Sequence, residues 1–261
     1  MQAPAKLSIS LWVIRSRWAL SRSSLVIRRL APLTKATPND IFNKLSQQNP
    51  NLQLKELGCI GETTTSMIQG GVCNYGADGS QLNAAVDFLE HNHVGLITVD
   101  IGANDIDSCI GMNGVNKLCV FAALERVAGD LSFILGELRR ADPNVPIIGM
   151  TYYDPFLAAW TLGTTGQAIA IQSLEATDLF NGVLDSVYHV FGARVADVAG
   201  AFQINNFAPG PDSRPENVDQ TFQLTWIILG LGPAIVVANV HPNPAGYAVI
   251  AAAFEAKIGI P

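Results

Sequence analysis

The chain has 261 residues, of which 49% are hydrophobic and 15% are charged, so it is long enough to bury one sizeable core. Its formal net charge is −6, and phosphate contacts need clustered lysines and arginines, so we expect no nucleic-acid partner. Residues 224–240 are almost wholly apolar, but the stretch is short and broken by Gly230, Gly232 and Pro233, which favours buried core over stable membrane insertion.

The first 39 residues differ in charge from the rest of the chain. They contain seven basic side chains and no acidic one, whereas the remainder contains nine basic and 22 acidic side chains, so +7 and −13 give the net −6. Transit peptides have such a composition, and residues 7–14 resemble a short signal-peptide core, but the segment matches both patterns poorly. We expect residues 1–38 to be an atypical basic segment, disordered or out of frame, and residues 39–261 to form one domain.

Strand-like and helical segments alternate along the chain. Apolar runs typical of buried strands occupy residues 52–57, 94–101, 145–152 and 194–198. Helical patterns occupy residues 81–91, 119–140, 168–191 and 245–257. This alternation predicts an α/β fold, a three-layer, doubly wound parallel sheet of the flavodoxin-like kind, whose site lies outside the carboxyl ends of the strands.

Three polar motifs occur at the expected ends of elements. Gly61-Glu62-Thr63-Thr64 follows the first of these strands, and Ile101-Gly102-Ala103-Asn104-Asp105 closes the second. Val240-His241-Pro242-Asn243-Pro244-Ala245-Gly246-Tyr247 opens the last, alanine-rich helix. In this order the three motifs resemble the SGNH (GDSL-type) esterase and lipase family, over roughly residues 39–261.

The resemblance implies a serine esterase that hydrolyses small-molecule or lipid esters as a monomer, without a metal or cofactor. Gly61 would contribute its main-chain N–H to the oxyanion hole, and the Asn104 side-chain amide would be the second donor. Taken from the residues alone, Gly61 is also typical of a turn and Asn104 of a strand cap. Their joint spacing favours the oxyanion role.

His241 is the expected general base, because an imidazole titrates near neutral pH and both accepts and returns a proton. Pro242, Asn243 and Gly246 predict a turn that leads into the final helix. The other three histidines lie at expected helix ends or in loops, and we interpret them as surface residues: His91, His93 and His189.

The acid that usually precedes this histidine in the family is missing, since Ala238 and Asn239 stand in its place. A main-chain carbonyl or the amide oxygen of Asn239 could orient the imidazole instead. Asp105 and Asp107 are alternatives, although their position favours capping of their own loop. Losing a triad carboxylate without replacement costs about four orders of magnitude in rate.

The nucleophile motif Gly-Asp-Ser is also absent. The best match at the expected position is Ala19-Leu20-Ser21-Arg22-Ser23, which makes Ser23 the candidate nucleophile, with Ser24 as a competitor. Arg22 and Ser21 replace the aspartate and the glycine that form the tight turn of the family. The alternative interpretation is a solvated serine in a disordered arm.

A shifted reading frame explains both the unusual composition and the missing motif. If the given sequence is read one base late before about residue 39, each true codon consists of the last base of one observed codon and the first two bases of the next. In that frame the codons for Leu25-Val26-Ile27-Arg28 can hide Gly-Asp-Ser, and those around Ala36-Thr37-Pro38 can hide Gly-Tyr-Ala. Similar proteins carry a Gly-Tyr pair at that second position. A frameshifted or miscalled start upstream of residue 39 is therefore our leading hypothesis for this segment.

Four cysteines occur as two local couples, Cys59 with Cys73 and Cys109 with Cys119, and no Cys-x-x-Cys metal pattern is present. An even count in glycine-rich loops favours disulfides in an oxidising compartment, and we choose the local pairing over pairings that cross between loops. Four buried, reduced thiols are the alternative. Similar loop cysteines occur in secreted bacterial members of the family, which implies an extracellular protein.

The sequence thus favours a serine esterase, and its rival is an impaired SGNH-like chain that only binds a ligand. A flavodoxin-like nucleotide binder is disfavoured, because no glycine-rich phosphate loop follows any expected strand.

Overall fold

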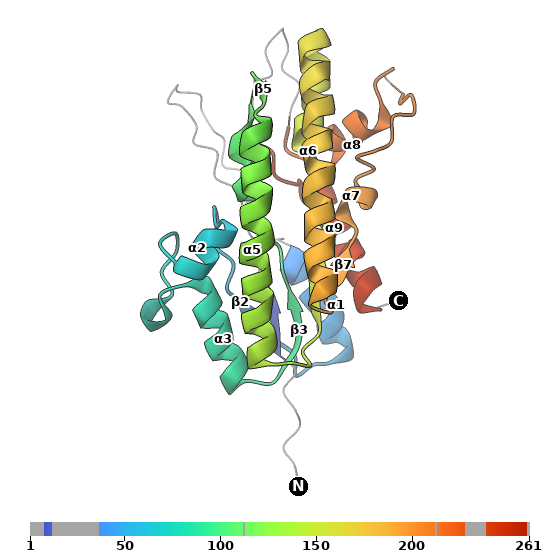
Figure 1. Cartoon of the computed structure of the whole chain (residues 1–261). Helices are drawn as coiled ribbons and strands as arrows, with labels where there is room; N and C mark the ends of the chain where they lie inside the picture. Colours follow the sequence, from blue (N-terminus) through green and yellow to red (C-terminus); the bar gives the residue numbers. More distant parts are fainter. Residues whose placement is uncertain (1–7, 12–36, 112, 212, 228–238, 260–261) are drawn as a thin grey trace, which may run out of the picture.

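The structure is a computed structural model that describes residues 8–11, 37–111, 113–211, 213–227 and 239–259 (Figure 1). The expected strand before Ser23, Ser23 itself, Ala238 and most of the apolar stretch 224–240 lie outside these residues. The boundary expected after residue 38 stays a prediction.

Five parallel strands form the central sheet, in the order β2-β1-β3-β6-β7. They are β1 (Ser8–Leu11), β2 (Gln53–Glu56), β3 (Val94–Thr98), β6 (Ile147–Met150) and β7 (Arg194–Ala196). Taken in chain order the strands follow the 2-1-3-4-5 arrangement of doubly wound flavodoxin-like sheets, which confirms the predicted fold class. A small antiparallel pair, β4 (Ile110–Gly111) and β5 (Gly114–Val115), lies apart from this sheet.

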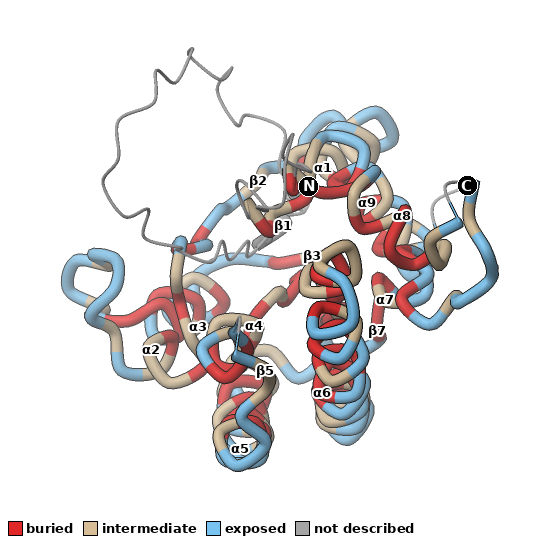
Figure 2. The backbone as a smooth tube through the Cα atoms, turned by 90° about the horizontal axis from the view of Figure 1, so that it is seen from above, coloured by how far each residue is buried: buried red, intermediate tan, exposed pale blue. Residues whose placement is uncertain are grey.

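Helices cover both faces of the sheet. Figure 2 shows α1 and α9 on one side of the strands and α5 and α6 on the other, where these two long helices run side by side in front of the sheet in Figure 1. The α-helices are α1 (Thr37–Gln48), α2 (Thr64–Gln69), α3 (Gln81–His91), α4 (Ala103–Ile106), α5 (Lys117–Ala141), α6 (Gly163–Val190), α7 (Val198–Ala201), α8 (Glu216–Leu224) and α9 (Pro244–Ile258). Short 3₁₀ turns are η1 (Gly76–Asp78), η2 (Asp107–Cys109) and η3 (Pro155–Leu162).

The core has two parts, one on each face of the sheet. On the α5 side, Val127, Leu131, Ile134 and Leu138 share one face of the helix at three- and four-residue spacing, and all are fully buried. On the other side, Ile41 of α1 and residues of α9 form the second part.

Gly149 of β6 sets how closely α6 approaches the sheet. A Cβ atom at this position would lie 2.1 Å from the ring of Tyr188, so only glycine leaves room for that fully buried aromatic side chain. The α6 helix therefore packs directly on the strand.

Several elements differ in length from the prediction. The α3 helix has the expected bounds, but β3 ends at Thr98 rather than at residue 101, because its pairing with β6 stops there and Gly102 turns the chain with a φ of +117°. β1, α1 and α8 were not among the predicted elements. β1 lies inside the basic N-terminal segment and nevertheless belongs to the central sheet.

Among the described residues, the structure has no helix with the length and hydropathy needed to span a bilayer.

Candidate active site

A cavity lies beyond the carboxyl ends of β3 and β6, where the doubly wound fold places its sites. Residues that follow β3 and β6, together with α6 and the loop before α9, line it. They are Asp100, Ala103, Asn104, Ile106, Asp107, Ile110, Met150, Tyr152, Tyr153, Pro155, Phe156, Thr177, Phe180, Val240, His241, Pro242, Tyr247 and Ile250. The structure thus brings Asn104 and His241, which are 137 positions apart in the sequence (241 − 104), to one cavity.

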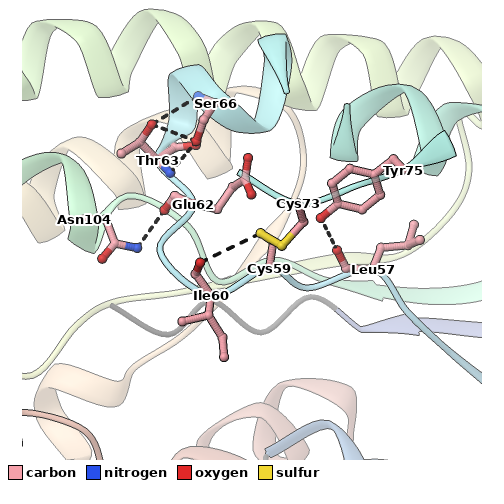
Figure 3. Close-up of a disulfide and its surroundings, with 9 residues drawn as sticks. All are labelled: Leu57, Cys59, Ile60, Glu62, Thr63, Ser66, Cys73, Tyr75 and Asn104. Carbon is pink, nitrogen blue, oxygen red and sulfur yellow. Dashed lines mark hydrogen bonds between the residues drawn. A yellow bond between two sulfur atoms is a disulfide. The ribbon is translucent and has the colours of Figure 1, made fainter. Parts of the chain in front are cut away.

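A hydrogen bond from Asn104 connects the Gly61 turn to this cavity. Gly61 has a φ of +85°, a conformation that favours glycine, and it is not among the residues that line the cavity. The Asn104 side-chain Nδ2 donates a 2.7 Å hydrogen bond to the main-chain oxygen of Glu62, the residue after Gly61 (Figure 3). The Gly61 turn and α4, which carry the two expected oxyanion donors, are therefore bonded directly to each other.

His241 lies in a loop fixed by main-chain hydrogen bonds. Its main-chain oxygen accepts from the Trp226 N–H at 3.0 Å, and its N–H donates to the Asn239 side-chain oxygen at 3.2 Å. The Asn239 amide oxygen thus holds the main chain of His241, and the role of Asn239 toward the imidazole stays a prediction.

The turn after His241 is built as the sequence predicts. The Asn243 side chain caps α9 by accepting from the main-chain N–H groups of Ala245 and Gly246, at 2.9 and 3.0 Å. A Cβ on Gly246 would lie 2.1 Å from the main-chain oxygen of Leu224, so glycine is required for this close approach. The helix and the histidine loop are thereby held against the end of α8.

Two tyrosines that sequence reasoning missed complete the wall of the cavity. The Tyr153 hydroxyl donates a 2.7 Å hydrogen bond to the main-chain oxygen of Val240, beside His241, and the Tyr152 hydroxyl bonds to Asp100. Burial raises the pKa of both hydroxyls well above the usual value. The available signal was the polar Tyr-Tyr-Asp run at the end of the expected strand 145–152.

The two aspartates weighed as partners of His241 lie differently. Asp105 bonds to Thr64 and is not among the residues that line the cavity. Asp107 lines the cavity together with His241, and burial raises its pKa to about 7, reinforced by repulsion from Asp154 and Asp105. At neutral pH this carboxyl is therefore partly protonated.

Both predicted disulfides are present. Cys59 and Cys73 are joined with their Cα atoms 6.0 Å apart, and Cys109 and Cys119 with theirs 5.4 Å apart. Gly61 lies in the loop that Cys59 and Cys73 close.

Glu62 is fully buried beside the first disulfide. Its carboxyl oxygens have no hydrogen-bond partner among the described residues, and burial raises its pKa. It forms, with Cys59 and Cys73, a group of metal-type ligands, but the two sulfur atoms are bonded to each other.

The three other histidines do not line the cavity. His91, His93 and His189 are exposed on the surface, as predicted. Ser23 is outside the described residues, as is everything that directly follows β1.

Comparison with known proteins gives a family and a fold. The model of the GDSL-like lipase/acylhydrolase family matches residues 30–249. No curated protein gives a significant match.

Several solved structures resemble the chain. An acetylxylan esterase from Geobacillus stearothermophilus has a TM-score of 0.54 at 15% identity, covering 100% of this chain and 98% of that chain. A lipase from a goat rumen metagenome has a TM-score of 0.56 at 12% identity, with 96% of each chain covered. Phospholipase A1 from Streptomyces albidoflavus has a TM-score of 0.51 at 18% identity, covering 85% of this chain and 86% of that chain. These similarities establish the shared fold, and since the family model matches most of the sequence, the chain belongs to the GDSL-like lipase/acylhydrolase family.

Proposed function

We propose that the chain is built to hydrolyse carboxylic esters by acyl transfer through a serine. The observation that carries this proposal is the shared cavity of Asn104 and His241, with Asn104 bonded to the Gly61 turn. An amide donor and an imidazole in one cavity are two of the three groups that acyl transfer needs, and the nucleophile is the third.

In the proposed reaction a serine hydroxyl attacks the ester carbonyl carbon while His241 takes its proton. The negative charge that forms on the carbonyl oxygen is held by the Gly61 N–H and the second hydrogen of the Asn104 amide, since the first is bonded to Glu62. His241 then protonates the leaving alcohol, and water, activated in the same way, releases the acid. The mechanism requires no metal or cofactor.

The serine of this reaction comes from the segment before residue 39. The family match begins at residue 30, after Ser23, and the printed sequence has no Gly-Asp-Ser motif. We infer that the motif is hidden by a shifted reading frame upstream of residue 39. The 261-residue chain as given would therefore have a base and oxyanion donors but a poor nucleophile.

An impaired chain that only binds ligand is the second candidate, favoured by the missing motif. Both candidates share the same cavity and the same ester or acyl-sugar ligand class. We propose that either form is a secreted monomer. The two disulfides support secretion, because disulfides persist in oxidising compartments.

Hydrolysis of p-nitrophenyl acetate separates these candidates. We expect the printed chain to be very weakly active, and the chain with the restored frame to be faster by orders of magnitude, because removing a triad member leaves only residual catalysis. In the restored chain, Asn104→Ala should lower kcat by about 10²–10³-fold. His189→Ala, on the exposed end of α6, is the matched histidine control for His241→Ala.

Two results would change the assignment. If the printed chain is fully active and Ser23→Ala abolishes the activity, Ser23 is the nucleophile and the frame hypothesis is wrong. If the chain with the restored frame stays inactive although a fluorophosphonate labels its serine, the missing aspartate before His241, and not the nucleophile, is the cause of the inactivity.

A further inference from the structure

A buried carboxylate joins the two segments that carry the proposed oxyanion donors, the Gly61 turn and α4. The side chain of Asp105, the residue after Asn104, is 1% exposed. Its Oδ2 accepts from the Thr64 main-chain N–H at 2.9 Å, and its Oδ1 accepts from the Thr64 hydroxyl at 2.9 Å. Thr64 begins α2 directly after the Gly61 turn, so this pair of bonds ties the turn to α4.

The long helix α5 contributes a second carboxylate to the same point. Asp130 accepts from the Thr65 hydroxyl at 2.6 Å and lies 3.1 Å from the Thr64 hydroxyl. The Thr64 hydroxyl has one hydrogen, so it donates to Asp105 or to Asp130 at any moment, whereas the Thr64 N–H donates to Asp105. Arg126, also on α5, places its Nε 3.8 Å from Asp105.

The Asp105 carboxylate adds a further attachment between the Gly61 turn and α4. The bond from Asn104 to the Glu62 oxygen is one hydrogen bond between these two segments. The bonds that Thr64 donates to Asp105 add a second attachment, two residues after Glu62. Two attachments fix both the position and the direction of a donor, which oxyanion stabilisation requires to within about 0.5 Å.

We propose that Asp105 is a positioning residue that aligns the Gly61 N–H with the Asn104 amide by holding Thr64. This inference rests on the proposed function, because it takes Gly61 and Asn104 as the oxyanion donors. Asp105 is not among the described residues that line the cavity, so it acts through Thr64 and not on the substrate.

The test uses four single substitutions in the chain form that hydrolyses p-nitrophenyl acetate. Asp105→Asn keeps the shape and replaces one acceptor with a donor, and Thr64→Val removes the hydroxyl. Thr64→Ser restores that hydroxyl. Thr65→Val is the matched control, since the same change at the next residue removes a bond to Asp130 only.

We expect Asp105→Asn and Thr64→Val to lower kcat by about ten- to a hundredfold with KM unchanged within about twofold, because misplacing a catalytic donor by about 1 Å costs this much. Thr64→Ser and Thr65→Val should stay within about twofold of the parent chain. A kcat loss for Thr65→Val as large as that for Thr64→Val, or an unchanged kcat in Asp105→Asn, would overturn the proposal. If Asp105→Asn fails to fold, the contrast between Thr64→Val and Thr64→Ser decides.

Hydrogen exchange of the main-chain amides from Gly61 to Thr64 gives a readout without turnover. Exchange about tenfold faster in Asp105→Asn and Thr64→Val, but not in Thr65→Val, supports the positioning role, even if every chain is inactive as an esterase. Inactivity of every chain would refute the proposed function and leave the positioning role in place. Unchanged exchange in both variants overturns the positioning role while leaving any measured esterase activity in place.

Discussion

Replacing Gly246 with alanine tests whether the close approach of α9 to α8 contributes to the stability of the fold. The added Cβ would lie 2.1 Å from the main-chain oxygen of Leu224 and 2.9 Å from the Pro242 side chain. The Leu224 oxygen cannot move freely, because it also accepts from the Asn243 N–H at 2.9 Å. The helix must therefore shift, and the shift breaks this bond.

The expected cost follows from these contacts. Overpacking costs about 1–3 kcal/mol and the lost hydrogen bond about 1 kcal/mol, whereas alanine regains up to about 1 kcal/mol of helix propensity over glycine. A net loss of about 2 kcal/mol lowers Tm by about 4–8 °C for a domain of this size.

Calorimetry of Gly246→Ala beside Gly182→Ala measures this difference. Gly182 lies on the exposed side of α6 with no atom within 4 Å of its would-be Cβ, so alanine there should raise stability slightly. If both variants are as stable as the parent chain, the close approach does not constrain α9 and the reasoning fails.

Two further predictions concern the disulfides and a buried acid. Replacing Cys59 and Cys73 together with serine should lower the free energy of unfolding by about 3 kcal/mol, the value for a loop of about this length, and reactive thiols in the unreduced native protein would contradict the pairing. Burial raises the pKa of Asp154 to about 7, so the folded chain keeps a proton that the unfolded chain releases near pH 4. Stability contributed by this group should fall as pH rises from about 4 to about 7. Asp154→Asn keeps an acceptor for the Phe156 N–H and places an amide donor beside the Ser173 hydroxyl. In urea titrations this variant should lose less stability between pH 4 and pH 7 than the parent chain. An unchanged pH dependence would show that Asp154 is ionised in the folded chain.

Local signals account for the parts of the fold that the sequence predicted. The helix predicted over residues 81–91 has the observed bounds, and the structure shows Ser80 as its N-cap and Asn92 as its C-cap. The start of α6 was missed, since Gly163 and Gly166 are poor helix formers. A Cβ on Gly166 would lie 2.0 Å from the Ala159 oxygen, so tertiary packing on η3 requires glycine inside this helix.

The site was predictable where its residues occur in short motifs. Asn104 and His241 were identified in this way, and they line one cavity. The bonds from Thr64 to Asp105 and from Tyr153 to Val240 join residues 41 and 87 positions apart, and no periodicity in a single sequence connects such partners. Loop geometry set by the fold decides these contacts.

The place of β1 in the sheet has a consequence for any chain shortened at its start. β1 pairs with β2 on one side and β3 on the other, so its removal would open the middle of the sheet and not its rim. Strands in a sheet lie about 4.8 Å apart, and two strands left at twice that spacing cannot bond to each other. Their facing edges would form a slot of unpaired N–H and C=O groups, the kind of opening into which a separate extended peptide inserts as the missing strand.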